Sequence, residues 1–129
     1  MKIGSTIARY LLGLIFLVFG LNHYFNFIPT GPMPTGIAGQ FFGALIASRY
    51  MYVVAFFEVA PAILLLINRY VPLALTMLGP VIVNIVLTIV LMSPQGLPMA
   101  VLLLILWPLT AWPLRSVFLP FLEPRIAAK

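Results

Sequence analysis

Long apolar segments alternate with short polar or proline-rich interruptions along the whole chain. A membrane-spanning helix needs about 20 predominantly apolar residues, because the hydrocarbon core is about 30 Å thick and a helix rises about 1.5 Å per residue. Four segments come close to this length or exceed it, and they cover residues 7–27, 50–67, 71–92 and 97–114. The pattern predicts an all-α integral membrane protein, with four transmembrane helices in a single domain over residues 1–129.

The connections between these segments predict how the helices pack. Residues 68–70 and 93–96 are very short turns, so the third span must return beside the second and the fourth beside the third. This predicts an antiparallel four-helix bundle. Three prolines and two glycines between residues 29 and 36 predict a loop. Residues 37–48 are apolar but too short to cross, so we expect an interfacial or re-entrant helix there, after the first span.

The composition supports the membrane interpretation. The chain is 64% hydrophobic and 7% charged, whereas a soluble domain carries about 25% charged residues. A soluble globular enzyme and a disordered chain are therefore both excluded. The chain has no cysteine and one histidine, which excludes disulfides, thiolate metal sites and a bis-histidine haem. We expect no intrinsic cofactor and no self-contained catalyst.

The net charge of +5 comes from basic residues that are scattered singly. They form no basic patch, so we interpret them as topology determinants and expect no nucleic-acid partner. With four spans, Arg49 falls alone on one side of the bilayer. The other side collects Lys2, Arg9, Arg69, Arg115, Arg125 and Lys129. The positive-inside rule predicts a multi-pass protein of the bacterial inner membrane with both termini in the cytoplasm.

Small residues within the spans indicate where helices approach each other. Gly13 and Gly20 are seven residues apart on one face of the first span, and we interpret them as a packing stripe. Ala55 and Ala62 lie one turn before and one turn after Glu58 in the second span. They predict that the face carrying Glu58 points into the bundle.

Glu58 is the most informative polar residue, because it lies eight residues into the second span. A carboxyl group near the middle of a bilayer costs several kcal/mol to insert and is a functional candidate by default. Two interpretations remain open. Glu58 carries protons or binds a ligand, or it is a neutral, hydrogen-bonded group that fixes helix packing.

Two other polar residues lie at a depth similar to that of Glu58. From helix geometry, His23, Glu58 and Asn84 fall within about 6 Å of one another along the membrane normal. We expect them to form an outward-facing, ligand-binding cluster, with Thr88 one turn beyond Asn84 and Asn22 beside His23. In the alternative interpretation, His23 only contacts water or lipid headgroups.

Several segments resemble the DoxX family of small four-span membrane proteins. Residues 8–16 read ARYLLGLIF, residues 20–25 read GLNHYF, and residues 57–66 read FEVAPAILLL. The short helix that ends in Ala44-Leu45-Ile46 and the Asn68-Arg69-Tyr70 turn also fit. The family pattern usually has glycine at or near the position of Pro61. The resemblance covers about residues 7–113 and implies a four-helix membrane bundle. It also implies an association with membrane oxidoreductase assemblies, including quinone-linked thiosulfate oxidation, or a role in assembly.

Three functions therefore compete. The first is a non-catalytic accessory subunit or assembly factor of a membrane oxidoreductase complex, whose partner is a membrane or peripheral redox protein. The second is an intramembrane site for a quinone or another lipid-like molecule near Glu58, His23 and Asn84. The third is a proton-coupled transporter, which is the weakest because transporters show internal repeats and more spans. A homo-oligomer would supply the missing spans.

Overall fold

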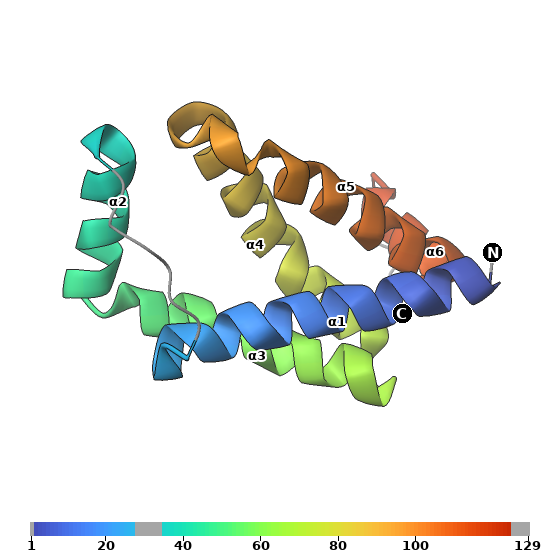
Figure 1. Ribbon diagram of the computed structural model, residues 1–129. Coiled ribbons are helices and arrows are strands. Elements are labelled where there is room, and N and C mark those ends of the chain that lie inside the picture. Colours follow the sequence, from blue (N-terminus) through green and yellow to red (C-terminus); the bar gives the residue numbers. More distant parts are fainter. Residues whose placement is uncertain (1, 28–34, 125–129) are drawn as a thin grey trace.

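The computed structural model describes residues 2–27 and 35–124, and all regular structure within them is helical. The proline-rich loop predicted over residues 29–36 lies almost entirely outside these ranges. In chain order the elements are α1 (Lys2–Phe25), α2 (Gly36–Ala47), α3 (Tyr50–Ile67), α4 (Val71–Met92), η1 (Pro94–Gly96), α5 (Leu97–Ala111), η2 (Trp112–Leu114), α6 (Arg115–Phe118) and η3 (Leu119–Leu122). Figure 1 shows their arrangement.

Four helical stretches of the described chain are long and apolar enough to cross a membrane, as a multi-pass membrane protein requires. They are Ile3–Phe25, Tyr50–Ile67, Val71–Met92 and Pro94–Leu122. The second and third match the predicted spans residue for residue. The fourth continues past the predicted end at residue 114, because prolines at 113 and 120 fit the first turns of two short helical segments and do not stop the chain.

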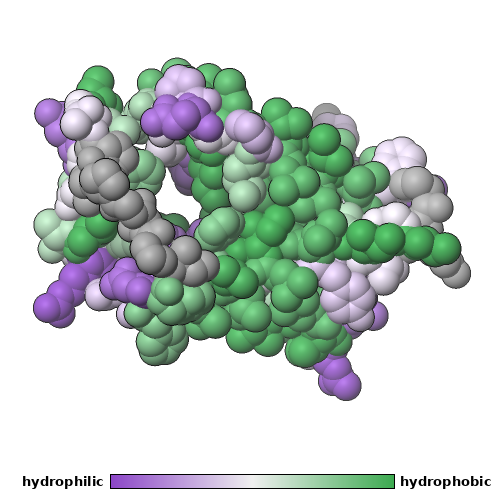
Figure 2. Space-filling view, in the orientation of Figure 1, coloured by the Kyte–Doolittle hydropathy of each residue, from purple (hydrophilic) through white to green (hydrophobic). Residues whose placement is uncertain are grey.

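The four long helices pack around one core. Helix α1 contacts α3 and α5, and α4 contacts the same two helices, so α1 and α4 lie on opposite corners. The largest fully buried side chains come from all four: Leu12, Phe16, Leu65, Leu75, Leu78 and Leu103. A polar contact also joins α4 to α5, because the Trp107 indole N–H donates to the Leu75 carbonyl over 2.9 Å. The outer surface of the bundle is apolar, with hydrophilic residues gathered mainly toward its two ends (Figure 2).

Helix α2 stands apart from this core. It has 12 residues, and it contacts the bundle through α3 and α4 (Figure 1). Ala38 is its one buried residue. Such a helix contributes little to the core, as expected for a segment too short to cross a bilayer.

The turn between α3 and α4 has a definite backbone geometry. Asn68 and Tyr70 both have left-handed conformations, with φ of 58° and 52°. The Arg69 N–H donates to the Leu64 carbonyl over 3.1 Å, which satisfies a free carbonyl at the end of α3. Asparagine adopts this conformation readily, whereas tyrosine does so at a steric cost. The turn ends α3 sharply, so α4 can pack against it.

Two glycines bring α1 close to α3. A Cβ atom added at Gly20 would lie 2.6 Å from Val59 Cγ2 and 3.2 Å from Glu58 Cβ. At Gly13 it would lie 3.0 Å from the end of the Leu66 side chain and 3.2 Å from the Ala62 carbonyl oxygen. These two positions confirm the packing stripe predicted from their spacing, since neither leaves room for a side chain.

The substitution Gly20→Ala tests this close approach. We expect it to lower the free energy of unfolding by about 1–3 kcal/mol, because Val59 is β-branched and cannot yield without moving the backbone. The measurement is thermal unfolding in detergent, followed by circular dichroism. Gly79→Ala is the matched control, since nothing lies within 4 Å of its added Cβ, and alanine should stabilise that helix by up to about 1 kcal/mol. Equal effects of the two substitutions would contradict the packing role of Gly20.

Candidate functional site

Glu58 lies on the face of α3 that points into the bundle. The residue is only 4% exposed, and Ala55, Pro61 and Ala62 on the same face are also buried. This confirms the inward orientation predicted from the small neighbours. An acidic side chain in such surroundings needs a polar partner, because the apolar side chains around it offer no hydrogen bonds.

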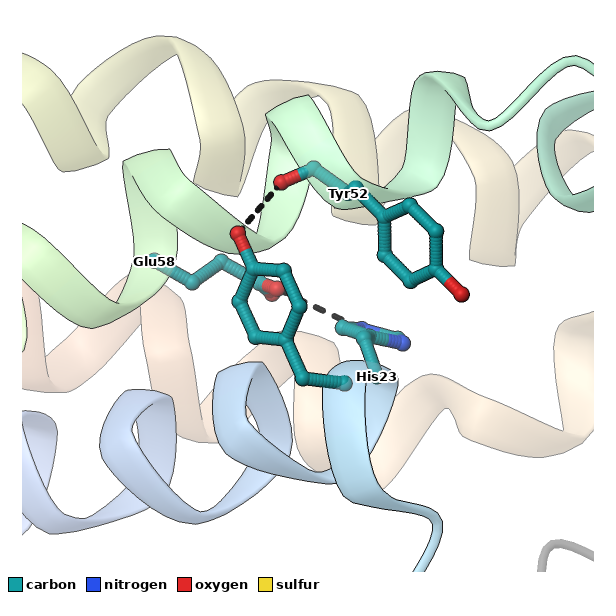
Figure 3. Close-up of polar contacts among 4 residues, drawn as sticks. His23, Tyr52 and Glu58 are labelled. Carbon is teal, nitrogen blue, oxygen red and sulfur yellow. Dashed lines mark hydrogen bonds and ion pairs between the residues drawn. The ribbon is translucent and has the colours of Figure 1, made fainter.

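That partner is His23, in the last turn of α1. Its Nε2 atom lies 3.3 Å from Glu58 Oε2, and Figure 3 shows the two side chains meeting between α1 and α3. The contact confirms that His23 and Glu58 share one site, as their matched depth predicts. The His23 side chain is 32% exposed and that of Glu58 6%. The histidine therefore connects the buried carboxyl group with the surface.

The contact leaves part of the carboxyl group unsatisfied. Glu58 Oε2 is fully buried and accepts no hydrogen bond from the described residues. The distance to Nε2 is that of an ion pair, but the imidazole N–H does not point at this oxygen as a hydrogen bond requires. A buried acceptor without a donor costs about 1–3 kcal/mol. The pair thus retains an acceptor for a further donor.

Two tyrosines join the same two helices next to this pair. The Tyr24 hydroxyl donates to the Tyr52 carbonyl over 2.6 Å (Figure 3), and the two rings stack at a centroid distance of 5.5 Å. Sequence reasoning missed this contact. The position of Tyr24 directly after His23 gave no signal for it, because consecutive residues on a helix point in different directions.

Asn22 lies beside His23 as expected. The residue is 6% exposed, and its carbonyl accepts a hydrogen bond from the Asn26 N–H over 2.8 Å at the end of α1. Its burial places it inside the bundle. Asn22 therefore belongs to the same end of the α1–α3 interface as the His23–Glu58 pair.

The structure does not bring Asn84 and Thr88 into this cluster, and that part of the prediction needs correction. Asn84 is exposed, and its side-chain amide donates to the Pro80 carbonyl of its own helix over 3.1 Å. The Thr88 hydroxyl donates to the Asn84 carbonyl over 2.8 Å. Depth along the membrane normal says nothing about the direction in which a side chain points. Helix α4 also lies across the bundle from α1, where His23 is.

Arg9 has a role that the sequence did not reveal. Its guanidinium Nη1 donates to the Leu65 carbonyl near the end of α3, and the group also lies 4.3 Å above the Tyr10 ring. The Leu65 carbonyl also accepts from the Asn68 N–H over 3.3 Å, so Arg9 adds a second, charged donor there, and a cation at this end of a helix is stabilised by the helix dipole. Arg9 thus fixes the second end of the α1–α3 interface.

The described residues contain no group of three or more His, Cys, Asp or Glu side chains that would hold a metal ion. The chemistry that the site offers is therefore proton exchange and hydrogen bonding by a carboxyl group and an imidazole. Comparisons with models of protein families, with curated proteins and with solved structures found no match.

The burial of Glu58 leads to a prediction about two substitutions. Glu58→Gln should keep the fold, because the amide has the same size and also forms hydrogen bonds. Glu58→Lys should lower stability or insertion by about 3 kcal/mol, since it places a cation among apolar side chains and beside His23. The measurement is the yield of folded protein from membranes and its thermal unfolding in detergent.

Glu123→Lys is the matched control for the charge change, because Glu123 is the second acidic residue and is exposed. It should behave like the parent protein. A Glu58→Lys variant as stable as Glu123→Lys would mean that Glu58 faces water.

Proposed function

We propose that the chain crosses a lipid bilayer four times as an antiparallel bundle, with α2 at the membrane interface. The short turns after α3 and α4 support this, as does the apolar outer surface of the bundle. Arg9, Arg69 and Arg115 lie at the end of the bundle where α1 begins and α5 ends. We place that end, with both termini, in the cytoplasm of a bacterial cell, following the positive-inside rule.

Within this frame, His23 and Glu58 bind the polar head of a quinone or another lipid-like molecule. The observation that carries the proposal is the buried Glu58 Oε2 atom, which has no hydrogen-bond donor and lies 3.3 Å from a partly exposed histidine. Glu58 Oε2 can accept a further hydrogen bond, and the partly exposed His23 connects the pair with the surface. A ligand with a hydroxyl group would supply the missing donor.

The two side chains suit both redox forms of a quinone. The carboxylate accepts a hydrogen bond from the hydroxyl of the reduced form, and the imidazole N–H donates to the carbonyl of the oxidised form. Both groups also exchange protons, which quinone reduction consumes. The bound quinone itself would supply the electron-carrying chemistry, and this chain would position its head and exclude water from it.

A ligand site without metal ligands in the described chain suits a subunit that works with a redox partner. The resemblance of the first and second spans to the DoxX family supports a non-catalytic accessory or assembly role in a membrane oxidoreductase complex. The exposed apolar faces of the long helices offer surface to a membrane partner as well as to lipid. The partner would supply the electrons, while this chain holds the quinone.

The proposal predicts saturable quinone binding by the full-length protein. A short-chain quinone analogue is titrated into the purified protein in detergent, with the heat of binding as the signal. We expect His23→Gln and Glu58→Gln each to weaken binding about tenfold, because each removes a hydrogen bond that involves an ionisable group.

Asn84→Ala is the matched control, since it removes a polar side chain at similar depth that the structure places outside the pair. It should leave quinone affinity unchanged. If the parent protein shows no saturable binding, or if Asn84→Ala weakens binding as much as His23→Gln does, the proposal is wrong.

A further inference from the structure

A polar cavity of about 390 Å³ lies at the opposite end of the bundle from the His23–Glu58 pair. It is formed where α1 begins, α3 turns into α4, and α5 ends. Its lining includes six polar side chains: Ser5, Thr6, Arg9, Asn68, Tyr70 and Thr110. The Thr6 and Tyr70 hydroxyl groups are exposed and can donate to a ligand, and the described lining contains a cation but no carboxylate. This donor set suits an oxyanion.

Arg9 is fixed in position for such a ligand. Its hydrogen bond to the Leu65 carbonyl uses one of the five N–H donors of the guanidinium, and its contact with the Tyr10 ring orients the plane. An arginine held in this way loses little conformational freedom when it binds, and its planar fork matches the oxygens of a phosphate group. Arg9 lines the cavity, and its remaining N–H donors can bind a ligand there.

Position along α1 indicates where the phosphate comes from. Arg9 lies about 10 Å along the helix axis from Lys2, so in a bilayer of about 30 Å hydrocarbon thickness it lies near the boundary with the headgroups. A second cavity of about 230 Å³ lies at the same end of the bundle, and its lining is apolar apart from Arg115 and includes Trp107, Phe118 and Leu122. It offers apolar surface for an acyl chain.

We propose that this cavity binds the phosphate group of an anionic phospholipid, with Arg9 as the principal ligand and the Thr6 and Tyr70 hydroxyl groups as further donors. The site lies at the end that carries most of the basic residues. The proposal rests on the membrane insertion proposed above, but not on quinone binding, because the two sites share no residue.

The test uses the full-length protein in nanodiscs of phosphatidylcholine that contain a small fraction of labelled phosphatidylglycerol, with energy transfer from the protein's tryptophans as the signal. We expect phosphatidylglycerol to be enriched around the parent protein about fivefold over a labelled phosphatidylcholine, the size expected for one basic residue near a membrane surface. Arg9→Gln should abolish this enrichment. Recovery of the protein with the nanodiscs reports insertion separately.

Arg69→Gln is the matched control, because Arg69 is exposed in the turn between α3 and α4 at the same end and lines neither cavity. It removes the same charge and should keep the enrichment. If Arg9→Gln and Arg69→Gln reduce the enrichment equally, only the net charge matters and the site is wrong.

A double substitution covers the case in which Arg9→Gln does not fold. Thr6→Ala with Tyr70→Phe removes two hydroxyl groups from exposed side chains and leaves the core unchanged. It should lower the enrichment about threefold, as expected for weaker, neutral donors, and no change would overturn the proposal. Inorganic phosphate at millimolar concentration should not displace the lipid. Displacement would reject a lipid as the source and identify free phosphate instead.

Discussion

The α1–α3 interface depends on one constraint: the buried Glu58 carboxyl group must have a polar partner, and that partner is on another helix. His23 reaches it only because Gly20, one turn earlier on α1, lets the two backbones approach. A side chain at position 20 would contact Val59 at 2.6 Å and push the helices apart. The close approach and the polar contact therefore require each other.

The same interface is fixed at both ends by side-chain polar contacts. Arg9 binds the end of α3 at one end, and the His23–Glu58 and Tyr24–Tyr52 contacts join the helices at the other. By contrast, Thr76, Asn84, Thr88 and Thr110 each donate to the carbonyl four residues earlier in their own helix. A side chain that hydrogen-bonds within its own helix does not determine which helix packs against it. The α1–α3 pair is thus the most strongly specified part of the bundle, and both candidate ligand sites lie at its ends.

Sequence reasoning predicted four long apolar helices, two of them with the observed ends, because the bilayer thickness sets the length of an apolar helix whatever the tertiary contacts are. It also predicted that His23 and Glu58 meet. Helix geometry placed both residues at a similar depth, and the small neighbours of Glu58 showed which face of its helix points into the bundle. It was wrong about Asn84, because the rotation of α4 and its place across from α1 follow from packing and not from depth. The sequence identified Arg9 only as a charge that determines topology, because its hydrogen bond to the Leu65 carbonyl depends on where α3 ends in space.

A double-mutant cycle on His23 and Glu58 tests the central claim most directly. The free energies of unfolding of the parent protein, His23→Gln, Glu58→Gln and the double variant are measured in one detergent. The account predicts a coupling energy of about 0.5–3 kcal/mol between the two positions, because contacting residues are not additive. A parallel cycle on Asn84→Ala and Glu58→Gln should be additive within about 0.5 kcal/mol. Additivity of His23 and Glu58 would contradict a shared site.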